Sequence, residues 1–137
     1  DGGYIITGTT ESFGAGSSDL WLIKTDDQGN KLWDRTFSGD GYGGEGRSVQ
    51  QTLDGGYIIM GKSYVEDTDD LWLIKTDANG NKLWDRTFST ANFYRFSSIQ
   101  QTLDGGYITT GLKSTYEETG VLDWDLCLIK TDAEGNV

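Results

Sequence analysis

The feature that most limits how this chain folds is a set of three sequence blocks that recur at intervals of about 50 residues. The pentapeptide Asp-Gly-Gly-Tyr-Ile occurs three times, beginning at Asp1, Asp54 and Asp104. The octapeptide Asp-Leu-Trp-Leu-Ile-Lys-Thr-Asp spans 19–26 and 70–77, and it returns at 125–132 with Cys127 replacing the tryptophan. The nonapeptide Gly-Asn-Lys-Leu-Trp-Asp-Arg-Thr-Phe spans 29–37 and 80–88. A fixed period of this size is typical of an array of stacked structural units.

Each unit contains four segments with the composition of short β-strands, rich in β-branched and aromatic residues and bounded by Gly, Asn, Asp or Ser. In the first unit the predicted strands are Tyr4–Thr9, Asp19–Thr25, Lys31–Phe37 and Arg47–Thr52. The run Leu20–Ile23 is apolar without interruption, which is typical of a strand that is buried on both faces. Because no segment shows a convincing helical period, we expect an all-β fold.

The segments between the predicted strands are typical of tight turns. Asp26–Asn30 and Asp77–Asn81 each supply a glycine for positive φ, and Leu53–Gly56 and Leu103–Gly106 are turns of the same kind. Twenty glycines and no proline fit many such turns. Four antiparallel strands per unit, repeated about every 50 residues, predict β-propeller blades, roughly 2.5–3 of them. A β-solenoid or another stacked-sheet array is the alternative.

Several blocks resemble known propeller families. The segment Ser48–Gly61 resembles the first two strands of a WD-repeat blade, and Asp26–Trp33 resembles part of a pyrroloquinoline-quinone-type blade and, more loosely, the Asp-box. The chain as a whole is most similar to Asp-Gly-Gly-Tyr repeats of bacterial and archaeal surface proteins. It departs from the WD pattern because Trp33 and Asp34 fall in the last strand of the unit, and it has Gly-Asn-Lys where the quinone-type turn has Thr-Gly-Lys. The resemblance implies a propeller fold and gives little indication of function.

If the strands of a blade are labelled a to d from the centre outward, the resemblance implies the order b-c-d, a-b-c-d, a-b-c. The chain is then one repeat array, 1–137, with a partial blade 1–46, a blade 47–95 and a partial blade 96–137. Closed propellers typically have about four to eight blades, and fewer than three cannot close. We therefore expect either a window on a longer protein, which we favour, or an assembly of several copies.

The charge of the chain excludes several classes of partner. The net charge is −11, whereas nucleic-acid binding requires a basic stripe, so we expect no nucleic-acid partner and no binding to an anionic membrane surface. The sequence has no apolar run of about 18 residues, so we expect no membrane insertion. An acidic composition favours solubility. A more specific interpretation is that the protein binds cations or works in a salty, extracellular setting. We expect an extracellular or cell-surface location.

No catalytic residue is predicted, and we expect neither enzymatic activity nor a cofactor. The chain has no histidine, so its serines lack the usual general base. Its single cysteine, Cys127, cannot form an intrachain disulfide and is expected to be a buried, inert thiol. The pairs Glu66 with Asp67 and Glu117 with Glu118 could face other acids as in a glycosidase, but nothing in their spacing recommends this.

No metal site is predicted either. The motif Asp-x-x-Gly-Asn recurs at Asp26, Asp77 and Asp132, but it is too short for an EF-hand loop, and turn geometry accounts for it without an ion. The segment Gly39–Gly44 matches a glycine pattern of phosphate-binding loops. It has no following helix and carries Asp40 where phosphate would approach, so we expect a flexible loop.

The tryptophans of the repeated blocks are predicted to be structural. A feature that recurs in every unit is more consistent with packing between units than with an active site, because an active site needs only one copy. We therefore expect four tryptophans to pack between blades: Trp21, Trp33, Trp72 and Trp84.

The connections between strands differ in how much they vary. Successive strands alternate in direction, so the a–b and c–d turns lie on one face, here called the constant-turn face, and the b–c and d–a connections lie on the other. The second set varies in length and content between units and comprises 10–18, 39–46, 62–69, 90–94 and 112–124. Because binding is usually grafted onto such variation, this variable-loop face is the predicted binding surface.

The variable-loop face is predicted to collect aromatic residues, namely Phe13, Tyr42, Tyr64, Phe93, Tyr94, Tyr116 and Trp124. It also collects acids, namely Glu11, Asp40, Glu45, Glu66, Asp67, Asp69, Glu117 and Glu118. Aromatic side chains among carboxylates suit a protein or carbohydrate partner. In the alternative interpretation, the aromatics fix their own loops and the acids are only solvated.

Together these observations predict a non-enzymatic segment of an extracellular propeller that acts as a binding, adhesion or structural module. Its partners would be a protein or carbohydrate on the variable-loop face, and further blades of the same chain or other copies. One alternative is a fragment of a propeller enzyme, either a glycoside hydrolase or a quinone-dependent dehydrogenase. Another is a filament or surface-layer repeat that polymerises through open blade edges. Fold alone does not decide among them.

Overall fold

Ten antiparallel strands in three sheets make up the part of the chain that the computed structural model describes, which is residues 2–15, 17–39, 43–65, 68–89, 93–116 and 122–137. The first sheet has the order β1 (Ile5–Thr10), β2 (Asp19–Thr25), β3 (Lys31–Phe37). The middle sheet has the order β4 (Gly43–Gln51), β5 (Tyr57–Val65), β6 (Thr68–Thr76), β7 (Lys82–Phe88). The third sheet consists of β8 (Phe93–Gln101), β9 (Tyr107–Tyr116) and β10 (Leu122–Thr131), paired in that order.

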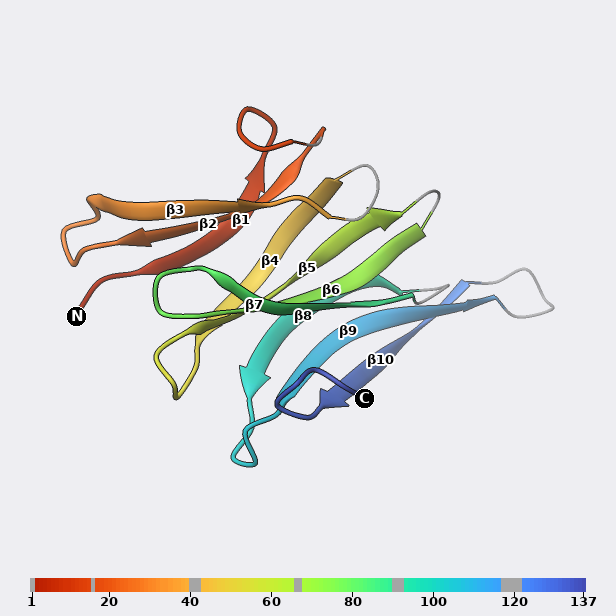
Figure 1. Ribbon diagram of the computed structural model, residues 1–137. Coiled ribbons are helices and arrows are strands. Elements are labelled where there is room, and N and C mark those ends of the chain that lie inside the picture. Colours follow the sequence, from red (N-terminus) through yellow and green to blue (C-terminus); the bar gives the residue numbers. More distant parts are fainter. Residues whose placement is uncertain (1, 16, 40–42, 66–67, 90–92, 117–121) are drawn as a thin grey trace.

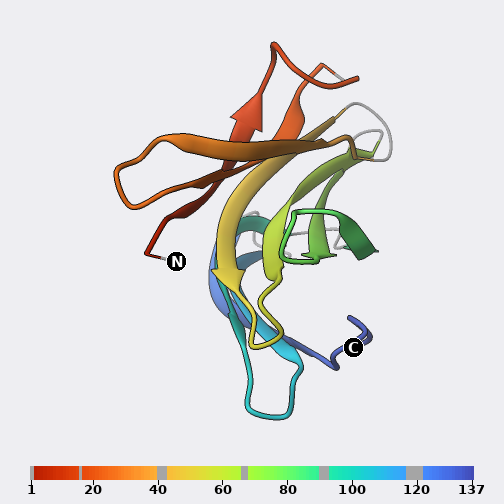
Figure 2. The ribbon, with the colours of Figure 1, turned by 60° about the vertical axis from the view of Figure 1, so that its left-hand side comes forward.

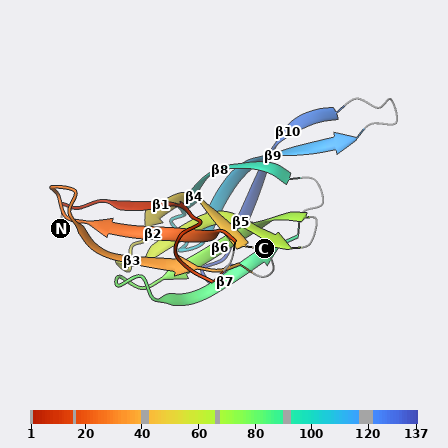
Figure 3. The same ribbon diagram turned by 90° about the horizontal axis from the view of Figure 1, so that it is seen from above.

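The three sheets follow one another as blades, with the middle sheet between the other two (Figure 1 and Figure 3). The predicted all-β fold with blade-like antiparallel sheets is confirmed, and no helix occurs among the described residues. Strands β4 and β8 begin their sheets and lie side by side. The amide of Ile99 on β8 donates a hydrogen bond to Oγ of Ser48 on β4 at 3.3 Å. These two inner strands, which the prediction labels a, therefore bring the middle and third sheets together at one edge.

Two hairpins are longer than the sequence predicted. Strands β5 and β6 stay paired as far as Val65 opposite Thr68, and β9 and β10 as far as Tyr116 opposite Leu122. The expected variable segments 62–69 and 112–124 are therefore mostly strand. Pairing continues because tyrosine, threonine and valine in these segments suit a pleated ladder. The expected loop at Gly39–Gly44 is likewise wrong at its end, because β4 begins at Gly43 and the Gly44 amide donates a hydrogen bond to the Ser18 carbonyl at 2.9 Å.

The core consists of two layers, one on each side of the middle sheet. The layer toward the first sheet contains Leu20, Leu22, Tyr57, Ile59, Trp72 and Ile74, all buried. The layer toward the third sheet contains Ile58, Met60, Leu71, Leu73, Phe96, Ile99 and Tyr107. Successive residues of a strand point to opposite faces, so β5 and β6 supply both layers.

The expectation that Leu20–Ile23 is buried on both faces was wrong, whereas the equivalent run in the middle sheet is buried on both faces. Every residue of Leu71–Thr76 is buried, whereas in the equivalent run Leu20–Ile23 only the two leucines are buried. Trp21 is half-buried because its side of the first sheet has no neighbouring sheet in the described structure. Cys127 is also half-buried, so the expectation of a buried thiol was wrong. Burial nevertheless raises the pKa of this thiol above its ordinary value.

Tryptophans of the outer strands β3 and β7 bridge neighbouring sheets. The ring of Trp33 lies 5.9 Å from that of Tyr57, and the ring of Trp84 lies 5.9 Å from that of Tyr107. The indole N–H groups of the tryptophans on β2 and β6 donate within their own sheet, although Trp72 also packs in the core layer toward the first sheet. Trp72 is buried and its indole N–H donates to Asp85 Oδ2 at 3.0 Å, while Trp21 donates to Asp34 Oδ2 at 2.9 Å. Trp21 lies on the outer face of the first sheet, where its ring contacts Phe13.

The turns of the constant-turn face are fixed by their own side chains. In one type, Asp26 Oδ1 accepts from the Gln28 and Asn30 amides at 3.0 and 2.8 Å, and Oδ2 accepts from Asn30 Nδ2 at 2.9 Å. The Asp77 and Asp132 turns repeat this arrangement. Because both carboxylate oxygens already accept hydrogen bonds, turn geometry accounts for the repeated aspartate.

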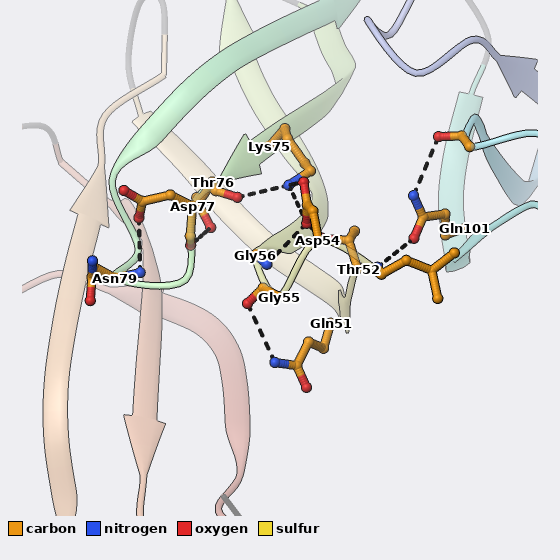
Figure 4. A network of polar contacts seen from close by, with 12 residues as sticks. Gln51, Thr52, Asp54, Gly55, Gly56, Lys75, Thr76, Asp77, Asn79 and Gln101 are labelled. Carbon is orange, nitrogen blue, oxygen red and sulfur yellow. Dashed lines mark hydrogen bonds and ion pairs between the residues drawn. The ribbon is translucent and has the colours of Figure 1, made fainter.

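The second type of constant turn holds a lysine from the neighbouring hairpin. Asp54 accepts hydrogen bonds from the Thr52 hydroxyl and the Gly56 amide, and Lys75 Nζ lies 2.8 Å from Asp54 Oδ2 (Figure 4). Lys75 also donates to the Thr76 carbonyl at 2.9 Å. The pKa of Asp54 is lowered to about 2, chiefly by the bond from Lys75. Asp104 and Lys130 repeat the pair in the third sheet.

Candidate ligand-binding groove

A groove opens at the inner strands between the middle and third sheets, near the variable-loop ends of β4, β5 and β8. Its volume is about 620 Å³, and its described lining is Arg47, Lys62, Arg95, Phe96, Ser97 and Leu112. This volume lies within the range of roughly 300–1,000 Å³ that small-molecule sites occupy. The lining is also unusual for this chain, because three cations converge in a molecule whose net charge is −11.

A β-bulge places one residue of each inner strand in the groove. In β4 the register with β5 shifts between Gly46 and Ser48, so Arg47 is the extra residue. In β8 the register with β9 shifts between Phe96 and Ser98, so Ser97 is the extra residue. A bulge changes the direction of the side chain that it carries. The two units therefore share one backbone irregularity but present different side chains, an arginine and a serine.

Two of the three cations are paired with carboxylates. Arg47 Nη2 lies 2.5 Å from Glu45 Oε2, and Lys62 Nζ lies 2.6 Å from Asp69 Oδ2. Lys62 is buried, and such a cation is retained only if it is paired. Two of the acids predicted on the variable-loop face, Glu45 and Asp69, are thus paired with cations of the groove.

Tyr64 belongs to the same network. Its hydroxyl donates a hydrogen bond to Glu45 Oε1, so one carboxylate joins Tyr64 to Arg47. Burial, reinforced by Glu45, raises the pKa of the Tyr64 phenol well above its ordinary value. The phenol therefore stays protonated, and Tyr64 orients Glu45 rather than presenting an open aromatic platform.

Arg95 differs from the other two cations because it is exposed and forms no ion pair within the described parts of the chain. It also lines a second hollow of about 300 Å³ with Leu112 and Trp124, next to the groove. With Arg47 and Lys62 paired to one carboxylate each, Arg95 gives the groove an excess of about one positive charge. The combined surface presents a guanidinium, an indole and aliphatic side chains.

The seven aromatic residues predicted to bind a partner lie in different environments. Phe13 contacts Trp21 with ring centroids 5.7 Å apart, Tyr64 bonds Glu45, and Trp124 lines the second hollow. Tyr42 and the side chains of Phe93, Tyr94 and Tyr116 lie outside the described residues. Among the predicted acids, the same holds for Asp40, Glu66, Asp67, Glu117 and Glu118. The described aromatics are thus not gathered into one platform.

Sequence reasoning missed the basic residues of the groove, although the sequence contains a signal for them. Seven of the eleven basic residues lie within the repeated blocks, and the other four are Arg47, Lys62, Arg95 and Lys113. Three of these four line the groove. Basic residues that do not recur in an otherwise acidic repeat protein therefore mark the site better than the aromatics do.

Comparison of the chain with models of known protein families and with curated proteins gave no match. Among the described residues, no three or more of the usual metal-ligating side chains gather into a cluster. In the same part of the chain, no helix has the length and apolar character needed to cross a membrane.

Proposed function

We propose that this chain is a non-enzymatic binding module that recognises anionic ligands on its variable-loop face. The groove between the middle and third sheets is the recognition site. Kinship with Asp-Gly-Gly-Tyr propeller repeats of surface proteins and an extracellular or cell-surface setting belong to the same proposal, and an acidic composition suits such a setting.

The observation that carries the proposal is the convergence of Arg47, Lys62 and Arg95 on one groove. An arginine presents a planar fork of donors that matches carboxylate and sulfate groups. Arg95 is exposed, and the other two cations are held in place by Glu45 and Asp69. Two paired cations beside the exposed guanidinium of Arg95 favour binding of a negatively charged ligand.

Trp124 and Leu112 add a surface for the uncharged part of such a ligand. Both line the hollow next to Arg95, and the indole is about half exposed. Aromatic faces bind sugar rings and apolar side chains alike, because they supply contact area at a small cost in conformational entropy. The arrangement therefore suits an acidic oligosaccharide, and an acidic peptide would use the same cations.

Calorimetric titration with oligogalacturonate, which carries one carboxylate per ring, and with a neutral oligosaccharide of equal length tests the proposal. We expect the acidic probe to bind with an affinity that falls as salt is added, and the neutral probe not to bind. A polyglutamate peptide is the third probe. Binding of the peptide alone would identify the ligand class as acidic protein segments, and no binding of either acidic probe would overturn the proposal.

The matched pair of variants is Arg95→Ala and Lys113→Ala. Both remove one exposed positive charge outside the repeated blocks, but only Arg95 lines the groove. A hydrogen bond to a charged group contributes about 1.5–3 kcal/mol, so Arg95→Ala should weaken binding by at least about tenfold. Equal losses in the two variants would show that net charge, and not the groove, governs binding.

A further inference from the structure

The constant-turn face displays leucines that the fold leaves exposed. Leu53 lies in the turn between β4 and β5, and Leu103 lies in the equivalent turn between β8 and β9. Leu53 is 87% exposed, and Leu103 is fully exposed. An exposed leucine adds little to the stability of its own turn, because almost none of its apolar surface is removed from water. Both units nevertheless carry a leucine at this position.

The exposure of Leu53 is not caused by a missing sheet. Its turn belongs to the middle sheet, which packs against a sheet on each side. The third sheet also reaches this turn directly. The amide of Leu53 donates a hydrogen bond to Oε1 of Gln101 on β8 at 2.9 Å. The next unit therefore holds the backbone of Leu53 and leaves its side chain in water.

Both leucines line a hollow of about 260 Å³ at the constant-turn ends of β4 and β8. Glutamines and threonines of the same two units complete its lining. Gln50 Oε1 accepts from the Gln101 amide at 2.7 Å, and Gln101 Nε2 donates to the Gly105 carbonyl at 3.3 Å. The volume is below the range of roughly 300–1,000 Å³ that small-molecule sites occupy, so the hollow suits a side chain of a partner protein.

The turns that carry the leucines are fixed by backbone hydrogen bonds. The Thr52 amide donates to the Gly56 carbonyl and the Gly55 amide donates to the Thr52 carbonyl, both at 2.9 Å. The turn of Leu103 repeats both bonds at the same distances. A contact group on a fixed backbone loses little conformational freedom when a partner binds, which favours affinity.

The constant-turn face also carries an excess of negative charge. Four lysines at this end each meet an aspartate at 2.8–3.2 Å. The other cations at this end are Lys24, which is buried, and Arg35 and Arg86, which stack on tryptophan rings. More numerous are the turn carboxylates that form no ion pair among the described residues, namely Asp26, Asp27, Asp77, Asp132 and Glu134.

One of these carboxylates lies near the turn of Leu53. Burial, followed by the charges of Asp54 and Glu134, raises the pKa of Tyr107 to about 12. Asp54 directly follows Leu53, so Glu134 acts on the same part of the molecule. Charges interact over about 8–10 Å at physiological salt, so a cation seated beside Leu53 would be attracted by Glu134.

We propose that the constant-turn face binds a basic, amphipathic segment of another protein. An apolar side chain of the segment enters the hollow between Leu53 and Leu103, and its lysines or arginines face the carboxylates of the turns. A second copy of this chain suits the face poorly, because its net charge is −11. The hollow and the groove lie at opposite ends of the inner strands, so either proposal stands if the other fails.

Fluorescence anisotropy with three labelled peptides of equal length tests the proposal. One peptide alternates lysine with leucine, the second has serine in place of leucine, and the third has serine in place of lysine. We expect the first peptide to bind at least about tenfold more tightly than either control, with an affinity that falls as salt is added. Equal binding of the lysine–serine peptide would show attraction by charge alone and would overturn the proposal, as would no binding of the first peptide.

A matched pair of double variants locates the site. Leu53→Ser with Leu103→Ser should weaken binding of the lysine–leucine peptide by at least about tenfold. Leu126→Ser with Leu128→Ser changes two exposed leucines of β10, away from the hollow, and should leave the affinity unchanged. Equal losses in the two variants would contradict the assignment to the hollow. Near-ultraviolet circular dichroism establishes that both variants are folded, as expected for exposed positions.

Sedimentation velocity of the chain without peptide tests a second copy as the occupant. We expect Leu53→Ser with Leu103→Ser to leave the sedimentation of the chain unchanged at every concentration. Self-association of the wild type that this variant abolishes would assign the face to contact between copies and would overturn the proposal.

Discussion

The same sequence blocks occupy two different environments, one in the middle sheet and one in the outer sheets. The hexapeptide Leu-Trp-Leu-Ile-Lys-Thr is buried throughout in β6, whereas in β2 its tryptophan and its isoleucine remain partly exposed. In the corresponding segment of β10, both leucines and the lysine are exposed. Identical residues in identical strands thus differ because of their neighbours. The stability of a unit therefore resides largely in its interfaces, as expected for a repeat array.

The largest contrast is expected for a leucine of the shared block. Leu73→Ala removes a fully buried side chain between the middle and third sheets, which should lower the free energy of unfolding by about 2–5 kcal/mol. Leu128→Ala makes the same change at the equivalent, exposed position and should lower it by less than about 0.5 kcal/mol. Urea denaturation of dilute samples measures both. Equal losses would mean that Leu128 is covered in solution.

A glycine of the constant turns gives the second contrast. Gly29 and Gly80 both have positive φ, 86° and 78°, so alanine should cost each turn about 1 kcal/mol. A Cβ at Gly80 would also come within 2.7 Å of the Trp33 ring, whereas at Gly29 nothing lies within 4 Å. We expect Gly80→Ala to cost about 2–3 kcal/mol in total. Thermal unfolding of the two variants tests whether the preceding sheet is held rigidly against this turn.

The smallest contrast concerns the two lysine–aspartate pairs. Lys75 is buried and Lys130 is partly exposed, yet each meets the aspartate of its own unit at 2.8–2.9 Å. Asp54→Asn leaves the Lys75 ammonium buried without its carboxylate. It should cost about 1 kcal/mol near neutral pH, a value that allows for the exposure of Asp54. The loss from Asp104→Asn should be smaller. A larger loss from Asp104→Asn would show that burial of the lysine does not strengthen the pair.

The pH dependence of this pair follows from the lowered pKa of Asp54. Its ordinary value is 3.8 and its folded value is about 2, so the pair stabilises the fold fully above about pH 4. This contribution is lost as the pH falls from about 4 to about 2, because the carboxylate is then protonated in both states. Chemical denaturation along this range should show a flatter curve for Asp54→Asn than for the wild type. Parallel curves would assign the acid sensitivity to other carboxylates.

Sequence periodicity predicted the strands of the repeated blocks closely. The bounds of β2 and β3 agree with the prediction, and β1 is displaced by one residue. These strands are delimited by Asp-x-x-Gly-Asn and Asp-Gly-Gly turns, whose hydrogen bonds are local and can be inferred from composition.

Features that depend on register could not be predicted in the same way. Strand β4 begins four residues earlier than expected, at Gly43, because pairing with β5 continues past the bulge at Arg47. The pairing of Lys62 with Asp69 requires a hairpin that extends almost to its tip. The prediction emphasised aromatic residues on loops, whereas the groove is formed by basic residues at strand ends. Their convergence becomes visible only when two neighbouring sheets are placed together.

The inner edge of the third sheet has a consequence for solubility. The outward-facing amides of Ile99 and Gln101 on β8 already donate to Ser48 Oγ and to Gln50 Oε1, the latter at 2.7 Å, and Figure 2 shows β4 and β8 passing close together. An unpaired strand edge is a template for amyloid-like growth, and side chains that occupy its donors remove that template. Because Ser48 and Gln50 accept hydrogen bonds from the amides of β8, the inner edge of the third sheet offers fewer free donors to a foreign strand.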